Sequence, residues 1–123
     1  MAKGARFLVC LVLTSCWHRD SIAAGSEMAA VRRIQLINSM EAAFHAEHGR
    51  FGSTEELGLQ HPRNWYESGY LFTLQTRGKG YVIQARPRNY PTAGRRSYYS
   101  DETLVIHQAW KNGSATASDQ EFR

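Results

Sequence analysis

Residues 70–86 read YLFTLQTRGKGYVIQAR, two runs rich in aromatic and β-branched residues on either side of a glycine-punctuated turn. The runs cover residues 70–76 and 81–86, with RGKG at 77–80 between them. Aromatic and β-branched residues favour strands, and glycine permits the tight reversal that joins two antiparallel strands. Pro87 cannot donate to a strand ladder and therefore ends the second run. This stretch predicts a β-hairpin.

A second hairpin is predicted downstream, after a loop that contains Asn89, Pro91 and Gly94. Its strands are residues 96–100 and 104–108, and residues 101–103 form its turn. The segment 59–69 is predicted to be a loop, and the tail 111–123, rich in small polar residues, is expected to fray.

Upstream of the hairpins, residues 28–48 contain neither proline nor glycine and are predicted to form an amphipathic helix. Ser26 is a suitable N-cap and Gly49 a suitable C-cap. Apolar side chains recur every three or four residues, as one helix face requires. They are Ala30, Ile34, Ile37, Met40 and Phe44, with Leu36 and Ala43 widening the stripe. We expect the stripe to pack on Phe72 and Leu74 of the first hairpin. Beyond the helix, Ser53 and Glu56 have the spacing of a capping box.

These elements predict an α+β domain over residues 27–110: one N-terminal amphipathic helix packed on a four-stranded antiparallel meander sheet. The chain has 123 residues, enough for one such domain.

The first fifteen residues have the pattern of an export signal. Lys3 and Arg6 form a basic start, an apolar run FLVCLVL covers residues 7–13, and small residues follow at 14–15. The run is much shorter than the roughly 20 residues needed to span a bilayer. We therefore predict a removable signal over residues 1–15 and not a transmembrane helix.

Residues 13–16, Leu-Thr-Ser-Cys, resemble the lipobox of bacterial lipoproteins, in which the cysteine thiol becomes lipidated. The resemblance implies cleavage before Cys16, a lipid anchor on its thiol, and residues 16–26 as a short tether. Asp does not follow Cys16 directly, which under the lipoprotein sorting rule favours an outer-membrane or periplasmic location. The alternative interpretation is a plain secretory signal cut near residues 21–25, with Cys16 discarded.

The charge of the processed chain is nearly balanced. Removing Lys3 and Arg6 from the 15 basic residues leaves 13 against 11 acidic residues, a net charge of +2. That is too weak to presume a global attraction to nucleic acid. The two cysteines, Cys10 and Cys16, leave no cysteine pair in the processed domain, so no disulfide is predicted.

No catalytic constellation, cofactor motif or metal-binding motif emerges from the sequence, so we predict neither an enzyme nor a cofactor. His45 and His48 lie three residues apart on the helix, but they lack a third ligand nearby. Glu41 and His45 have the spacing of a solvated helix pair. Gly78-Lys79-Gly80 belongs to the hairpin turn and is not a phosphate-binding loop.

Arginine and tyrosine side chains cluster in sequence around the loop between the hairpins. They are Arg86, Arg88, Arg95 and Arg96, with Tyr90, Tyr98 and Tyr99 between or beside them. Guanidinium groups beside aromatic planes are typical of polyanion-binding surfaces. A charged sheet edge that discourages strand pairing between molecules explains the same residues and is the favoured interpretation.

The order and spacing of residues 29–108 resemble the headpieces of type IV pilin-like and type II secretion pseudopilin-like proteins. The similar segments are IQLINSMEAAF at 34–44 with HGRF at 48–51, SGYLFTL at 68–74, GYVIQARP at 80–87 and GRRSYYSDETLVI at 94–106. The N-terminus differs: Ala5 follows Gly4 where those families are cut before an aromatic residue, and Val9 replaces their glutamate. Leu104 stands where they often have a turn glycine.

The resemblance implies a pilin-like structural or interaction protein displayed at a membrane, with protein partners in a pilus or secretion apparatus. The different N-terminus favours a tethered accessory role over that of a filament subunit. The alternative function is an extracytoplasmic binding module for nucleic acid or another polyanion, using Arg86, Arg88, Arg95, Arg96, Tyr90 and Tyr98.

Overall fold

The computed structural model describes the backbone of residues 2–123 and the side chains of residues 22–123. Within these residues, one long helix, α1 (Ala2–His48), precedes a six-stranded sheet. The strands are β1 (Asn64–Glu67), β2 (Tyr70–Arg77), β3 (Gly80–Pro87), β4 (Ser97–Asp101), β5 (Ile106–Ala109) and β6 (Gln120–Glu121). All neighbours are antiparallel and lie in chain order, which makes a meander. The predicted α+β class is confirmed, with six strands in place of four.

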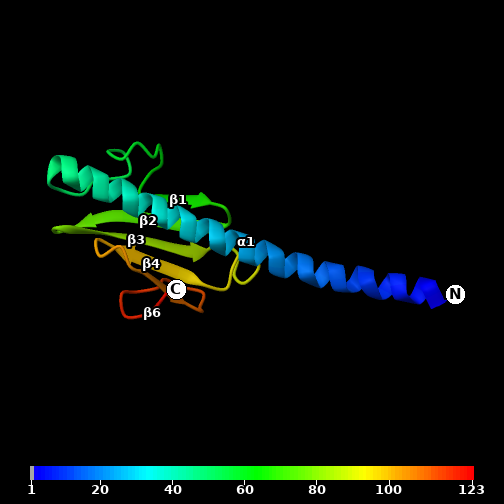
Figure 1. Ribbon diagram of the computed structural model, residues 1–123. Helices are drawn as coiled ribbons and strands as arrows, with labels where there is room; N and C mark the ends of the chain where they lie inside the picture. The colour runs from blue at the N-terminus through cyan, green and yellow to red at the C-terminus, as the bar shows by residue number, and fades with distance from the viewer. Residues whose placement is uncertain (1) are drawn as a thin grey trace.

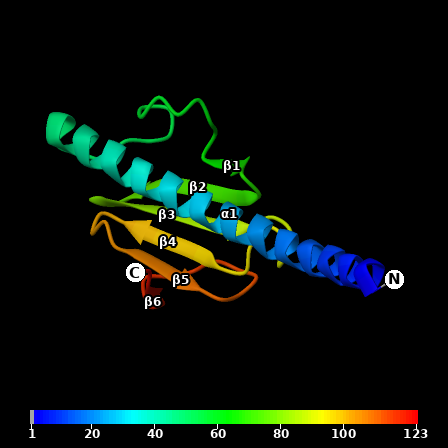
Figure 2. The same cartoon turned by 45° about the vertical axis from the view of Figure 1, so that its right-hand side comes forward.

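Helix α1 lies across one face of the sheet and continues well past its edge (Figure 1). The view turned by 45° shows the same arrangement, with the N-terminal part of α1 leaving beside the loop between β3 and β4 (Figure 2). We call the sheet, its loops and the part of α1 that covers it (residues 27–123) the head.

The helix does not begin after Ser26, as the sequence analysis expected. Residues 22–26 are helical, so this part of the expected tether 16–26 is not irregular. Ala23 and Ala24 are strong helix formers and offset the helix penalty of Gly25. The C-terminal prediction is confirmed: Gly49 has φ of +74°, and its N–H donates to the carbonyl of His45 at 2.8 Å.

The buried face of α1 differs in part from the predicted stripe. Ala30, Ile34 and Ile37 are fully buried, as expected, against Phe72 and Leu74. Leu36, however, is 48 % exposed.

Three further residues depart from the expected stripe. Ala43 is exposed and Met40 is only half-buried. Phe44 is half-buried and packs away from the sheet: its ring lies 4.2 Å from that of His48 and would lie 3.1 Å from a Cβ at Gly52. The buried face instead includes Val31 and three polar residues, Glu27, Asn38 and Glu41.

The first hairpin is confirmed, and a further one precedes it. Arg77 pairs with Gly80, so Gly78 and Lys79 form a two-residue turn in which Gly78 has φ of +58°. Before β2, the segment expected to be a loop contains β1. Ser68 and Gly69 both have positive φ, of 52° and 80°, which a type I′ hairpin turn requires.

The second hairpin is shorter than predicted, because β5 starts at Ile106 and not at residue 104. The N–H of Leu104 donates to the carbonyl of Asp101 at 2.9 Å, which closes a turn over residues 101–104. Leu104 has φ of +67°, a left-handed conformation that favours glycine. This conformation ends the turn and excludes Leu104 from the strand.

The tail 111–123 does not fray. β6 pairs with β5, and the N–H of Phe122 donates to the carbonyl of Ile106 at 2.7 Å. The Phe122 ring packs edge-on against Tyr98, and Ala115 is fully buried. Apolar anchors in a polar segment therefore order the tail and make the head larger than the predicted 27–110.

Candidate functional site

Three buried polar side chains on α1 attach the helix to the sheet and its loops at successive points. Glu27 lies where α1 leaves the sheet. Its Oε1 accepts from the N–H of Arg95 at 2.9 Å, and its Oε2 pairs with the Arg96 guanidinium at 2.7 Å. This carboxylate therefore fixes the β3–β4 loop against the helix.

Asn38 forms the middle attachment. Its amide nitrogen donates to Ser100 Oγ at 2.9 Å, and its amide oxygen accepts from the Tyr81 hydroxyl at 2.7 Å. Ser100 Oγ in turn donates to the carbonyl of Val105 at 2.8 Å. Helix, β3 and β4 are thereby joined by one hydrogen-bonded chain that is buried within the core.

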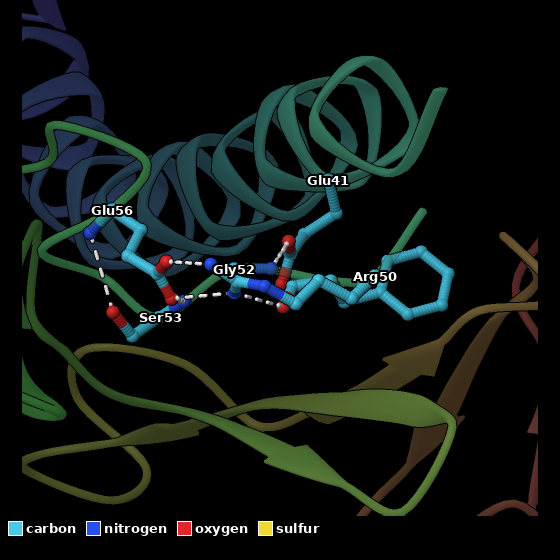
Figure 3. A network of polar contacts seen from close by, with 6 residues as sticks. Glu41, Arg50, Gly52, Ser53 and Glu56 are labelled. Atoms are coloured by element: carbon cyan, nitrogen blue, oxygen red, sulfur yellow. Dashed lines mark hydrogen bonds and ion pairs between the residues drawn. The ribbon is translucent and has the colours of Figure 1, made fainter. Parts of the chain in front are cut away.

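Glu41 forms the attachment at the C-terminal end of α1 (Figure 3). Its Oε1 accepts from the N–H of Gly52 at 2.8 Å, and no hydrogen-bond donor within the described part of the chain reaches its Oε2. Burial raises the pKa of Glu41 to about 7; the Gly52 hydrogen bond opposes this rise, and the charge of Glu56 adds to it. The loop after α1 is thus held by a buried carboxyl whose surroundings favour the protonated form.

The same loop carries the predicted capping box (Figure 3). Ser53 N–H donates to Glu56 Oε1, and Glu56 N–H donates to Ser53 Oγ, each at 3.2 Å. Arg50 donates two hydrogen bonds to the Glu56 carboxylate, and these lower the pKa of that carboxyl to about 2. The capping box is confirmed and stabilises the turn that presents Gly52 to Glu41.

The structure removes two residues from the predicted polyanion-binding set. Tyr98 is fully buried beneath α1, where burial raises its pKa to about 12, so its ring cannot stack on a ligand. Arg96 is committed internally: besides Glu27, it donates to Gln108 at 3.0 Å. Both side chains point to the helix side of the sheet. There the Glu27 carboxylate neutralises Arg96, and the core buries Tyr98.

The other members gather at the end of the head from which α1 emerges. Arg86 and Arg88 are exposed, Tyr90 is 41 % exposed, and Arg95 is exposed beside the Glu27 attachment. Tyr99, in contrast, lies on β4 and donates to Asp101 at 3.0 Å.

Two exposed aromatics at this end were not predicted. Tyr66 is 58 % exposed, and the Arg88 guanidinium lies 4.4 Å above its ring. Trp110 is 64 % exposed and lies 4.9 Å from the Arg96 guanidinium. The sequence does contain a signal for Tyr66: Ser68-Gly69 is typical of a hairpin turn, and a hairpin turn before β2 implies that the segment preceding it is a strand. Trp110 also directly follows the second hairpin.

The helix histidines take part in ring contacts. His45 stacks on Phe51 at 4.5 Å, and His48 contacts Phe44. Among the side chains that the structure describes, no group of three or more His, Cys, Asp or Glu residues could hold a metal ion.

The Cys16 side chain lies outside the described side chains, so cleavage and lipidation remain predictions. Over the described residues, no helix combines the length and hydropathy needed to cross a membrane.

Comparison with known proteins gives no relationship: the chain matches no protein-family model, and no curated protein or solved structure is significantly similar to it.

Proposed function

We propose that the protein is an exported, membrane-tethered, pilin-like protein that works through protein–protein contacts as an accessory to a type IV pilus or type II secretion apparatus. The observation that carries this proposal is the arrangement of α1. One face of the helix is attached to a meander sheet, and its N-terminal part, which includes residues 16–26 of the proposed tether, projects beyond the head (Figure 1). Such a shape suits a head displayed on an N-terminal anchor.

The solvent-facing side of α1 supports a role in protein contacts. Met28 and Leu36 are 49 % and 48 % exposed, and they flank the exposed Arg32 at intervals of four residues on one helix ridge. Exposed large apolar side chains on a ridge are suited to packing against another helix. We therefore assign this ridge, residues 28, 32 and 36, as the contact face.

Co-purification from the cell envelope tests the proposal. The full chain should retain components of a pilus or secretion assembly, and Leu36→Glu should lose most of them, because burying a carboxylate in place of the apolar Leu36 side chain is unfavourable. Asn112→Glu adds the same charge at an exposed position after β5 and should leave the association intact. Absence of any such component from the unmodified chain, or equal capture by both variants, would contradict the proposal.

A further inference from the structure

The end of the head from which α1 emerges carries a group of exposed basic and aromatic side chains, which we call the proximal rim. Its members are Tyr66, Arg86, Arg88, Tyr90 and Trp110. Contacts place this end at α1: the N–H of Arg88 donates to the carbonyl of Gly69 at 2.8 Å, and a Cβ at Gly69 would lie 3.6 Å from Ser26 Oγ. The rim therefore lies at the end of the head where α1 leaves it; Figure 2 shows α1 leaving beside the loop between β3 and β4.

Strand register explains how the rim forms. Tyr66, Leu71 and Arg86 are directly paired across β1, β2 and β3, on the sheet face away from α1. Arg88 follows two residues after Arg86 and covers the Tyr66 ring at 4.4 Å. Trp110 stands on the helix side, beside Arg96. Cations and aromatic rings thus occupy both sides of the end, and neither group is used by the core.

The charge around the rim is positive because the neighbouring carboxylates are neutralised. Glu27 is paired with Arg96, and Glu67 is paired with Arg33 at 2.5 Å. No ion pair within the described part of the chain engages Arg86 or Arg88. At the opposite end of the sheet, in contrast, Arg77 and Lys79 are balanced in charge by Asp101 and Glu102 of the β4–β5 turn.

We propose that the proximal rim docks the head on an anionic phospholipid surface, with Arg86 and Arg88 against lipid phosphates and Tyr66, Tyr90 and Trp110 at headgroup depth. Tyrosine and tryptophan favour the membrane–water interface, and basic residues near it are attracted to anionic lipids. This inference rests on the proposed tether. A helix from Cys16 to Ser26 spans about 15 Å, which keeps the rim within reach of the membrane that holds the anchor.

A membrane is favoured over nucleic acid as the occupant for two reasons. The set of residues that would stack on bases loses Tyr98 to the core. The remaining exposed side chains lie at the end of the head that faces the proposed anchor, where the membrane is the nearest anionic surface.

The experiment uses the full lipidated chain with Trp17→Phe, reconstituted into vesicles of phosphatidylcholine alone or mixed with phosphatidylglycerol. Lipids with a headgroup-attached spin label quench nearby tryptophan. The signal of Trp110 is the difference between this protein and the same protein carrying Trp110→Phe. We expect quenching in the mixed vesicles, little in phosphatidylcholine alone, and loss of the difference between about 0.05 and 0.5 M salt.

Removal of the two rim cations should reverse docking. Arg86→Gln with Arg88→Gln should lower the ratio of docked to undocked heads roughly tenfold or more, since each cation contributes separately. The matched control, Arg77→Gln with Lys79→Gln, removes the same charge from the hairpin at the other end of the sheet and should dock normally. Circular dichroism verifies that both variants are folded.

Equal quenching in the two vesicle types, or equal loss in both double variants, would overturn rim docking. Stronger rim-dependent affinity for duplex DNA than for the anionic vesicles would overturn it in favour of a nucleic-acid site. If the chain remains in the vesicles but its head does not dock, only this inference is contradicted. A chain that leaves the vesicles altogether contradicts the tether in the proposed function.

Discussion

Glu41 is the residue at which pH should act on stability. Its pKa in the folded chain is about 7 against an ordinary value of 4.5, because burial disfavours the ionised form. The folded state therefore holds this proton more tightly than the unfolded state. The contribution of this bound proton to the free energy of unfolding is fully present below about pH 4.5 and is lost as the pH rises through 7.

We predict that the free energy of unfolding falls by about 3 kcal/mol between those pH values. Urea denaturation at a series of pH values measures this change. Glu41→Gln should flatten the dependence while keeping an oxygen that accepts from Gly52. Glu47→Gln, on the exposed side of the same helix, should keep the full slope; an unchanged slope in Glu41→Gln would show that other groups cause it.

Leu104 is held in a conformation that costs an L-residue about 1–2 kcal/mol. Leu104→Gly removes this cost and its side chain is half-exposed, so little packing is lost. After the greater entropy of an unfolded glycine is subtracted, we expect a gain of up to about 1 kcal/mol in chemical denaturation. Leu104→Ala keeps the penalty and should give no gain. Equal stability of both variants would mean that the turn is not strained.

At the scale of elements, one face of α1 should carry the stability of the head. Ile34 is fully buried against the sheet, whereas Leu36, two residues later, is half-exposed. Ile34→Ala should lower the free energy of unfolding by about 2–5 kcal/mol. Leu36→Ala should change it by less than about 0.5 kcal/mol. Similar losses for the two variants, measured by urea denaturation, would place the wrong face of α1 on the sheet.

The sequence predicts elements best where one local rule dominates. The hairpin over residues 70–87, the glycine at the end of α1 and the Ser53–Glu56 capping box are all local patterns, and all three are confirmed. β6 depends on a distant partner: its pairing with β5 and the burial of Phe122 cannot be inferred from a polar tail. Leu36 and Ala43 fit an apolar stripe, but the sheet selects a face that includes Asn38 and Glu41.

For the candidate site, too, local sequence patterns predict part of the residue set, and the remainder depends on how the sheet folds. Sequence proximity groups Arg86, Arg88, Arg95, Arg96 and Tyr98, but strand alternation sends Arg96 and Tyr98 to the core side. Tyr66 and Trp110 join the exposed set only because the meander brings the end of β1 and the end of β5 to the same end of the sheet. A sequence pattern can therefore suggest a basic and aromatic surface without fixing its members.

At the scale of the whole molecule, the account depends on how the chain is anchored. The proposed docking of the rim and the proposed contact ridge both presuppose that the chain is attached from its N-terminal side. Cys16 is the residue proposed to provide this attachment, through lipidation after removal of residues 1–15.

Mass spectrometry of the chain purified from the membrane fraction tests this claim most directly. We predict a mature N-terminus at Cys16 whose mass includes a lipid; Cys16→Ala should abolish the modification, while Cys10→Ala should leave it intact. A mature chain that begins beyond Cys16, or one that retains residues 1–15 without lipid, would contradict the account.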